Sequence, residues 1–142
     1  MARVEIALPE RFAFATELPI RVDDLNYGAH LGNDRVLTLV HEARVRWLRS
    51  HALSELDVGD GVGLILADAA VIYRAEGKLG QVLRIELGAG EVRTRAFELV
   101  YRLGDAATGQ EIALAKTGVL CFDYRTRRVT SLPAALKAAL GA

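Results

Sequence analysis

The sequence predicts an α+β fold in which a curved antiparallel sheet wraps around one long helix. Apolar residues recur at steps of three and four from Val36 to Leu48, which is the spacing of one helical face. After this helix come about four strand-like segments joined by short loops rich in Gly and Asp, which favours antiparallel pairing. One helix cannot cover both faces of such a sheet. We therefore expect the sheet to curve around the helix and a second subunit to cover its edges or outer face.

The first elements surround a polar turn. Residues 12–22 read as a strand, and Pro19 within it indicates an edge position or a bulge. Gly32, Asn33 and Asp34 precede the helix, which we expect to end near Ser50. Asn and Asp are preferred where a helix must satisfy its free N–H groups, so both are predicted to cap it.

The remaining elements are predicted from the alternation of apolar and polar residues and from the turn-forming residues between these segments. Residues 51–62 form a connection, and residues 104–110 have the composition of a hairpin loop. Ser131 is a candidate cap for a short terminal helix. The predicted strands are 63–75, two strands within 81–103, and 111–124, followed by a helix at 131–140.

Length and composition exclude several classes of protein. We expect residues 1–142 to form one domain, since this length allows a substantial core. Lys plus Arg and Asp plus Glu number 18 each, so no general affinity for nucleic acid or membrane is expected. The single cysteine, Cys121, rules out an internal disulfide. An N-terminus that is neither a secretory signal nor a membrane span agrees with a cytoplasmic protein.

The turn before the helix is the predicted site of chemistry. Backbone N–H groups of residues 31–33 could hold an oxygen that gains negative charge, and Gly32 permits a close approach to that oxygen. Asn33 is expected to cap the helix whether or not this turn is catalytic. No group of residues has metal-ligand spacing, so we expect neither a metal nor another cofactor.

The group that activates water has several candidates. Asp24 and Asn26 are two positions apart, so in an extended segment both side chains point to the same side. Asp24 could then be the base that activates water, or it could simply be a solvated turn residue. His30 could act as an acid or base, or could only hold the turn. Glu42 has Arg46 at the spacing of an ion pair and lies about 13 Å beyond the helix start, so it could reach chemistry only across a subunit interface. His41, His51 and Cys121 are interpreted as structural.

A motif around this turn resembles a known family. Asn26-Tyr27-Gly28-Ala29-His30-Leu31-Gly32-Asn33, followed by Glu42-Ala43-Arg44, is similar to the Gly-His-x-Asn-Asn and Glu-Ala-Arg motifs of hotdog-fold acyl-CoA thioesterases. The branch in question includes 4-hydroxybenzoyl-CoA thioesterase. Residues 70–87 and 117–133 resemble later strands of the same family. Asn26 stands where many relatives have an acidic residue, and Gly32 replaces the first Asn.

The resemblance implies hydrolysis of acyl-CoA thioesters by a homodimer or homotetramer with sites between subunits. Coenzyme A carries phosphates, and the cations that could bind them are Arg74, Lys78, Arg93 and Arg95. Because Asn26 replaces the usual acid, a non-catalytic acyl-thioester binder is a second hypothesis. A hotdog hydratase or dehydratase is a third, although the proline-rich segment that usually carries its His is absent.

Overall fold

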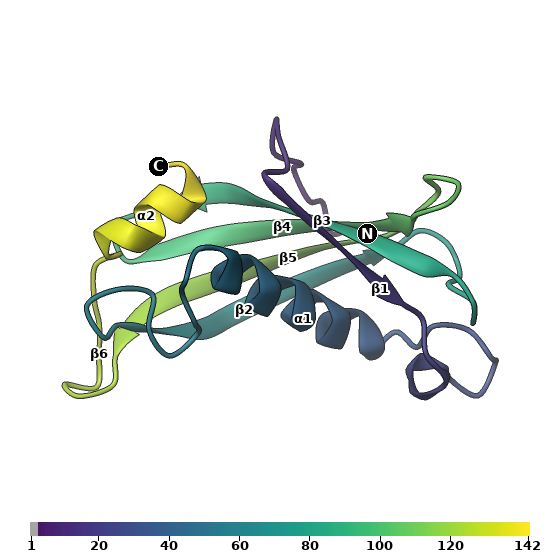
Figure 1. Ribbon diagram of the computed structural model, residues 1–142, viewed down its shortest axis with the longest axis horizontal. Coiled ribbons are helices and arrows are strands. Elements are labelled where there is room, and N and C mark those ends of the chain that lie inside the picture. The colour runs from purple at the N-terminus through teal and green to yellow at the C-terminus, as the bar shows by residue number, and fades with distance from the viewer. Residues whose placement is uncertain (1–2) are drawn as a thin grey trace.

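A computed structural model describes residues 3–142 of the chain. A single antiparallel sheet dominates, with one helix inserted after its first strand and another at the end (Figure 1). In chain order the elements are β1 (Phe14–Pro19), the 3-10 turn η1 (Val22–Asp24), α1 (Arg35–Ser50), β2 (Gly63–Tyr73), β3 (Val82–Val92), β4 (Ala96–Asp105), β5 (Glu111–Asp123), β6 (Arg128–Val129) and α2 (Ala134–Leu140).

The sheet has six strands, and its order is β1-β3-β4-β5-β2, with β6 paired to the end of β5. All pairings are antiparallel, as expected, and the sheet is curved. β1 and β2 lie at the two edges. Pro19 occupies the last position of edge strand β1, where its missing N–H costs little. Edge strand β2 is long and carries a bulge between Leu66 and Asp68.

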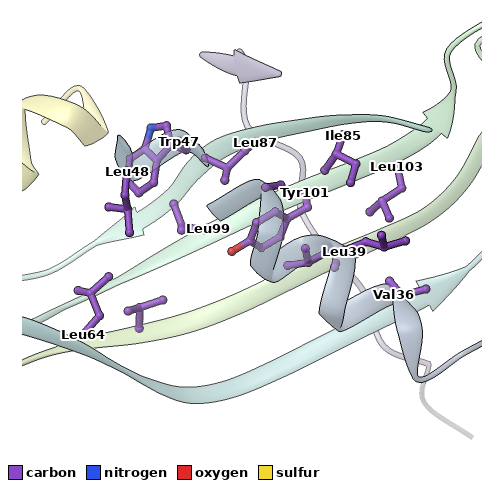
Figure 2. Close-up of a cluster of buried hydrophobic side chains, with 14 of the residues drawn as sticks. Val36, Leu39, Trp47, Leu48, Leu64, Ile85, Leu87, Leu99, Tyr101 and Leu103 are labelled. Carbon is purple, nitrogen blue, oxygen red and sulfur yellow. The ribbon is translucent and has the colours of Figure 1, made fainter. Parts of the chain in front are cut away.

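α1 packs across one face of the sheet and supplies a large part of the core. Its apolar stripe meets the inward-facing residues of β3, β4 and β5 (Figure 2). Fully burying one such Leu or Val stabilises the fold by about 1.5–3 kcal/mol. The buried residues of α1 are Val36, Leu39, Val40, Ala43, Arg44, Trp47 and Leu48. They fix which side of the helix faces the sheet.

The structure corrects several local predictions. α1 has only 16 residues, so the expected long central helix is not confirmed, whereas the predicted short terminal helix is present as the 7-residue α2. Pro133, not Ser131, is the N-cap residue of α2. At α1 the N-cap residue is Asp34, whose side chain makes no capping hydrogen bond, so the predicted cap at Asn33 is wrong. None of the helices within residues 3–142 is long and apolar enough to cross a membrane.

Candidate functional site

The turn before α1 is organised by the side chain of Asn26. Its Oδ1 accepts hydrogen bonds from the backbone N–H groups of Gly28 (2.9 Å) and His30 (3.3 Å). The Asn26 N–H in turn donates to the His30 carbonyl at 2.8 Å. Within this loop Ala29 has a φ of 63°, the left-handed conformation that a tight turn requires. The loop therefore holds His30 at a fixed place on the surface.

A second segment is attached to this loop by its backbone. The Leu31 N–H donates to the Gly77 carbonyl at 2.8 Å, and His30 forms an isolated β-bridge with Lys78. A side chain at Gly77 would come within 2.9 Å of Leu31 Cβ. The resulting close approach places the Glu76 carboxylate beside His30, with 3.1 Å between Oε2 and Nε2.

These two segments and the end of β2 enclose a pocket of about 330 Å³ at the N-terminus of α1. Tyr73 closes one side, where its hydroxyl donates to the Asn33 carbonyl at 3.0 Å. The pocket is lined by Asn26, Tyr27, His30, Leu31, Asn33, Tyr73, Ala75 and Glu76. Three residues singled out by the sequence, Asn26, His30 and Asn33, thus share one pocket. Glu76 was missed, because nothing in the motif points to a residue so far along the chain.

Two of the three predicted oxyanion donors are already used. The Leu31 N–H bonds to Gly77, and the Gly32 N–H bonds to the Asp24 carbonyl at 2.8 Å. Within residues 3–142, the N–H groups of Asn33 and Asp34 donate no hydrogen bond. Gly32 is buried, and a Cβ there would lie 2.6 Å from the Asp34 carboxylate, so a larger residue would require the exposed Asp34 side chain to move.

Asp24 does not line this pocket. Residues 22–24 form a 3-10 turn rather than the extended segment expected, so Asp24 is buried while Asn26 is exposed. One Asp24 oxygen accepts the Arg21 N–H at 2.9 Å, and the other meets the Arg35 guanidinium at 3.2 Å. The carboxylate therefore ties the turn to the first residue of α1.

Glu42 and the four candidate cations are dispersed. Glu42 forms the expected ion pair with Arg46 at 2.9 Å, on the side of α1 that faces β1. Arg74 and Lys78 lie near the pocket, and Arg74 pairs with Glu111. The other two cations, Arg93 and Arg95, lie in the β3–β4 turn at the opposite end of the eleven-residue strand β3. That is about 33 Å away in the same chain, so the four cannot bind one group of phosphates.

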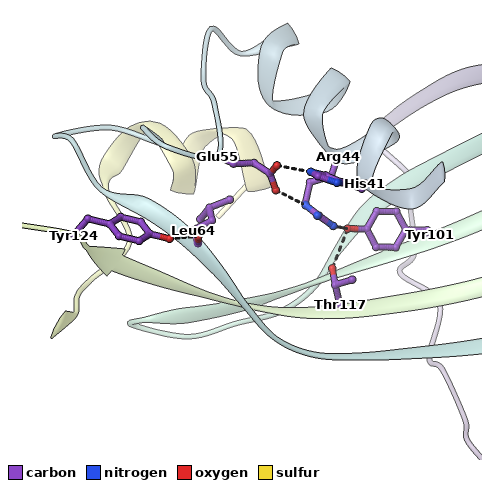
Figure 3. A network of polar contacts seen from close by, with 7 residues as sticks. All are labelled: His41, Arg44, Glu55, Leu64, Tyr101, Thr117 and Tyr124. Carbon is purple, nitrogen blue, oxygen red and sulfur yellow. Dashed lines mark hydrogen bonds and ion pairs between the residues drawn. The ribbon is translucent and has the colours of Figure 1, made fainter. Parts of the chain in front are cut away.

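A polar cluster lies further along α1, with Arg44, Tyr101 and Thr117 buried and His41 exposed (Figure 3). The Glu55 carboxylate meets His41 Nε2 at 2.6 Å and Arg44 Nε at 2.9 Å. The same guanidinium donates through Nη1 to the Tyr101 hydroxyl at 3.3 Å, which also bonds the hydroxyl of Thr117 at 2.9 Å. The prediction of a merely structural His41 left out its carboxylate partner, which lies in the α1–β2 connection.

Opposing effects set the pKa values in this cluster. Burial raises the pKa of Glu55, but hydrogen bonds from His41 and Arg44 outweigh burial and hold it below its ordinary value. Burial lowers the pKa of Arg44, yet Tyr101 and Glu55 together raise it above its ordinary value. Glu55 and Arg44 are therefore a carboxylate and a cation at neutral pH.

Comparisons with known proteins identify a family and solved structures that this chain resembles. The family model of the thioesterase-like superfamily matches residues 20–140. The structure is similar to that of Slr0204, a 1,4-dihydroxy-2-naphthoyl-CoA thioesterase from Synechocystis, with 26% sequence identity, a TM-score of 0.82, and coverage of 90% of this chain and 95% of that one. No curated protein sequence matches the chain.

Two further structures share the fold at lower identity. YbaW, a probable thioesterase from Escherichia coli, has 21% identity and a TM-score of 0.72, with 89% of this chain and 95% of that one covered. SAV2348, a hypothetical protein from Staphylococcus aureus in complex with CoA, has 16% identity and a TM-score of 0.82, with 96% and 86% covered. The family match spans the turn, both helices and the whole sheet except β1, and it confirms the resemblance seen in the sequence: the chain belongs to the thioesterase-like superfamily.

Proposed function

We propose that this protein is a thioesterase that hydrolyses acyl-CoA thioesters to a free acid and CoA. The observation that carries the proposal is the pocket at the start of α1, where the His30–Glu76 pair and the helix N-terminus lie together. Thioester hydrolysis needs a base for water and donors for the oxyanion. Both kinds of group line or border this one pocket.

His30 is the proposed base. An ionised Glu76 takes the N–H of Nε2, which leaves Nδ1 to accept a proton from water, and Nδ1 has no partner within residues 3–142. The oxygen of that water attacks the thioester carbon. When the carbon–sulfur bond breaks, the leaving thiolate takes the proton back from the His30 imidazolium. Glu76 keeps the ring oriented during both transfers.

The oxyanion is assigned to the start of α1. The Asn33 and Asp34 N–H groups have no acceptor within the described chain, and they stand at the positive end of the helix dipole. The Asn26 side chain has its Oδ1 occupied by two backbone donors, so its Nδ2 remains to donate to the substrate carbonyl. In this arrangement Asn26 orients the substrate, while Asp24 holds the turn through Arg35.

The nature of the thiol partner is supported by the relatives. The Synechocystis thioesterase acts on a CoA ester, and the Staphylococcus aureus structure contains CoA. Arg74 and Lys78 lie close enough to the pocket to meet CoA phosphates from the same chain. Arg93 and Arg95 could meet them only from a partner subunit, because they lie at the other end of β3.

We also propose that the protein works as a homodimer formed through β2, or as a tetramer of such dimers. β2 is a long edge strand, and it exposes apolar side chains, with Leu66 48% and Tyr73 55% exposed. An uncovered edge of this kind pairs readily with another strand. Analytical ultracentrifugation at micromolar concentration should give a dimer or tetramer mass. Ala67→Lys, which adds a charge to the exposed edge, should weaken the association about tenfold, and a monomeric wild-type protein would refute this assembly.

Release of free thiol from a panel of acyl-CoAs tests the activity directly. We expect hydrolysis of at least one ester by the metal-free protein, and a loss of about 100-fold in kcat for His30→Gln. Tight binding of the same esters without thiol release would instead support the non-catalytic binder. That alternative draws on one observation, namely that the acidic side chain next to the motif, Asp24, is buried in an ion pair.

A further inference from the structure

A second pocket lies between α1, the α1–β2 connection and β2, and no step of the proposed reaction uses it. Its volume is about 340 Å³. One wall is apolar and the other carries the polar cluster of Figure 3. The apolar lining residues are Leu37, Val40, Leu56, Leu64, Leu66 and Ala69, and the polar ones are His41, Arg44, Glu55 and Thr117.

The polar wall offers both a hydrogen-bond donor and an acceptor. Arg44 is only 3% exposed, and it uses Nε for Glu55 and Nη1 for Tyr101. Its Nη2 donates no hydrogen bond within residues 3–142, although Arg44 lines the pocket. In the neutral imidazole whose Nε2–H donates a hydrogen bond to the Glu55 carboxylate, His41 Nδ1 carries a lone pair, and this atom also has no partner in the described chain.

A hydroxyl group matches this pair of atoms. It can donate its proton to His41 Nδ1 and accept a hydrogen bond from Arg44 Nη2. A carbonyl could only accept, and a methyl group could do neither. A carboxylate is disfavoured, because Glu55 already neutralises the charge of Arg44 at 2.9 Å.

We propose that this pocket receives the acyl group of the substrate, and that His41 and Arg44 recognise a hydroxyl group at its far end. The inference rests on the proposed function, because it takes an acyl-CoA as the ligand. His41 lies two helical turns beyond Asp34, about 10 Å along the axis of α1, so an acyl group held at the helix start could reach it. β2 also borders both pockets, with Leu64, Leu66 and Ala69 in this one and Tyr73 in the pocket at the helix start.

The volume limits the size of the acyl group. Pockets for small ligands range from about 300 to 1,000 Å³, and this pocket is at the lower end. It suits a chain of medium length or a single ring system rather than a long fatty chain. The expected substrate class is therefore a compact acyl-CoA that carries a distal hydroxyl.

A matched pair of esters tests the inference. ω-Hydroxyoctanoyl-CoA and nonanoyl-CoA have the same number of heavy atoms and differ only in whether the last one is an oxygen or a carbon. For the wild-type protein we expect kcat/KM to favour the hydroxyl ester about tenfold, the value of one hydrogen bond at a partly exposed site. Isothermal titration calorimetry with the same two esters on the His30→Gln variant should give a similar ratio of Kd values.

Three variants separate recognition from stability. His41→Phe keeps a ring of similar size without nitrogen atoms and should bring the ratio close to one, mainly through loss on the hydroxyl ester. His41→Gln keeps an amide that can serve both Glu55 and the ligand, so part of the preference should return. His51→Phe is the matched control, since His51 lies at the end of α1 against Trp47 and outside this pocket, and it should leave the ratio unchanged.

The outcomes distinguish this inference from the proposed function. Equal rates for both esters, unaltered by His41→Phe, would overturn the hydroxyl site while leaving the thioesterase intact. If no acyl-CoA of the whole panel is hydrolysed, the proposed function fails, and the calorimetric ratio for these two esters then decides the inference. A tenfold preference in Kd that His41→Phe abolishes would support the site, whereas equal affinities or no binding would overturn it.

Discussion

The Nε2 atom of His30 lies 3.1 Å from a carboxylate oxygen of Glu76, although the two residues belong to different loops. The loops meet because Leu31 bonds to the backbone of Gly77, where only glycine leaves enough room. The His–carboxylate pair is thus a product of tertiary packing around the turn. The motif contains His30 but does not reveal its carboxylate partner.

Replacing the two members of this pair should affect catalysis unequally. His30→Gln removes the proposed base and should lower kcat by about 100-fold, whereas Glu76→Gln removes only its orientation and should cost about tenfold. Steady-state kinetics between pH 5 and 9 would measure both. Full activity in His30→Gln would move the base elsewhere.

Asp24→Asn should reduce stability rather than activity. The substitution removes the charge that meets Arg35 and leaves a weaker hydrogen bond in a buried position, at a cost of about 1–3 kcal/mol. Asp23→Asn is a matched control one position away, because the Asp23 side chain is 67% exposed. Urea denaturation and kcat would be measured for both. A large fall in kcat without a change in stability would restore Asp24 as the base.

Asn26→Asp should retain or raise kcat/KM. A carboxylate oxygen can still accept the N–H groups of Gly28 and His30, and it adds the acid that many relatives have at this position. Asn26→Ala loses both bonds and should lower kcat without moving the pH profile, since orientation is lost and not basicity. Thiol-release kinetics distinguish the two variants. An inactive Asn26→Asp with normal stability would show that the amide itself is needed.

Glu55→Gln should change how stability depends on pH. The folded pKa of Glu55 lies below its ordinary 4.5, so its contribution is complete above that pH and is lost as pH falls through the lower folded pKa. The variant should lose about 1–3 kcal/mol at pH 7, less than for a fully buried pair because Glu55 is 30% exposed. Below pH 4 the difference from wild type should shrink. Glu42→Gln, which breaks an exposed pair, serves as the control in the same melting experiments.

The regular elements were largely predictable because their signals are local. The apolar spacing of α1 and the alternation within residues 81–103 depend on neighbours a few positions apart. The predicted helix end near Ser50 and the edge position of Pro19 are both confirmed. By contrast, η1 was missed, because its turn depends on Asp24 bonding backwards to Arg21 and forwards to Arg35.

The candidate site was only half predictable, because some of its residues are neighbours in the sequence and others are brought together by tertiary packing. The motif identified Asn26, His30 and Asn33, which lie within one short loop. It could not identify Glu76 or Glu55, whose partners are set by how distant loops pack. It also counted the N–H groups of Leu31 and Gly32 as available, although tertiary hydrogen bonds occupy both.

The bond between Leu31 and Gly77 also links the pocket to the local motions of the chain. Since this amide is protected only while the two loops remain joined, its hydrogen–deuterium exchange reports each opening that would separate His30 from Glu76. When closing is faster than exchange from the open state, the measured exchange rate is proportional to the fraction of time for which the two loops are apart. A variant such as Gly77→Ala, which forces the loops apart, should speed exchange at Leu31 while leaving the amides of β4 in the middle of the sheet as slow as before.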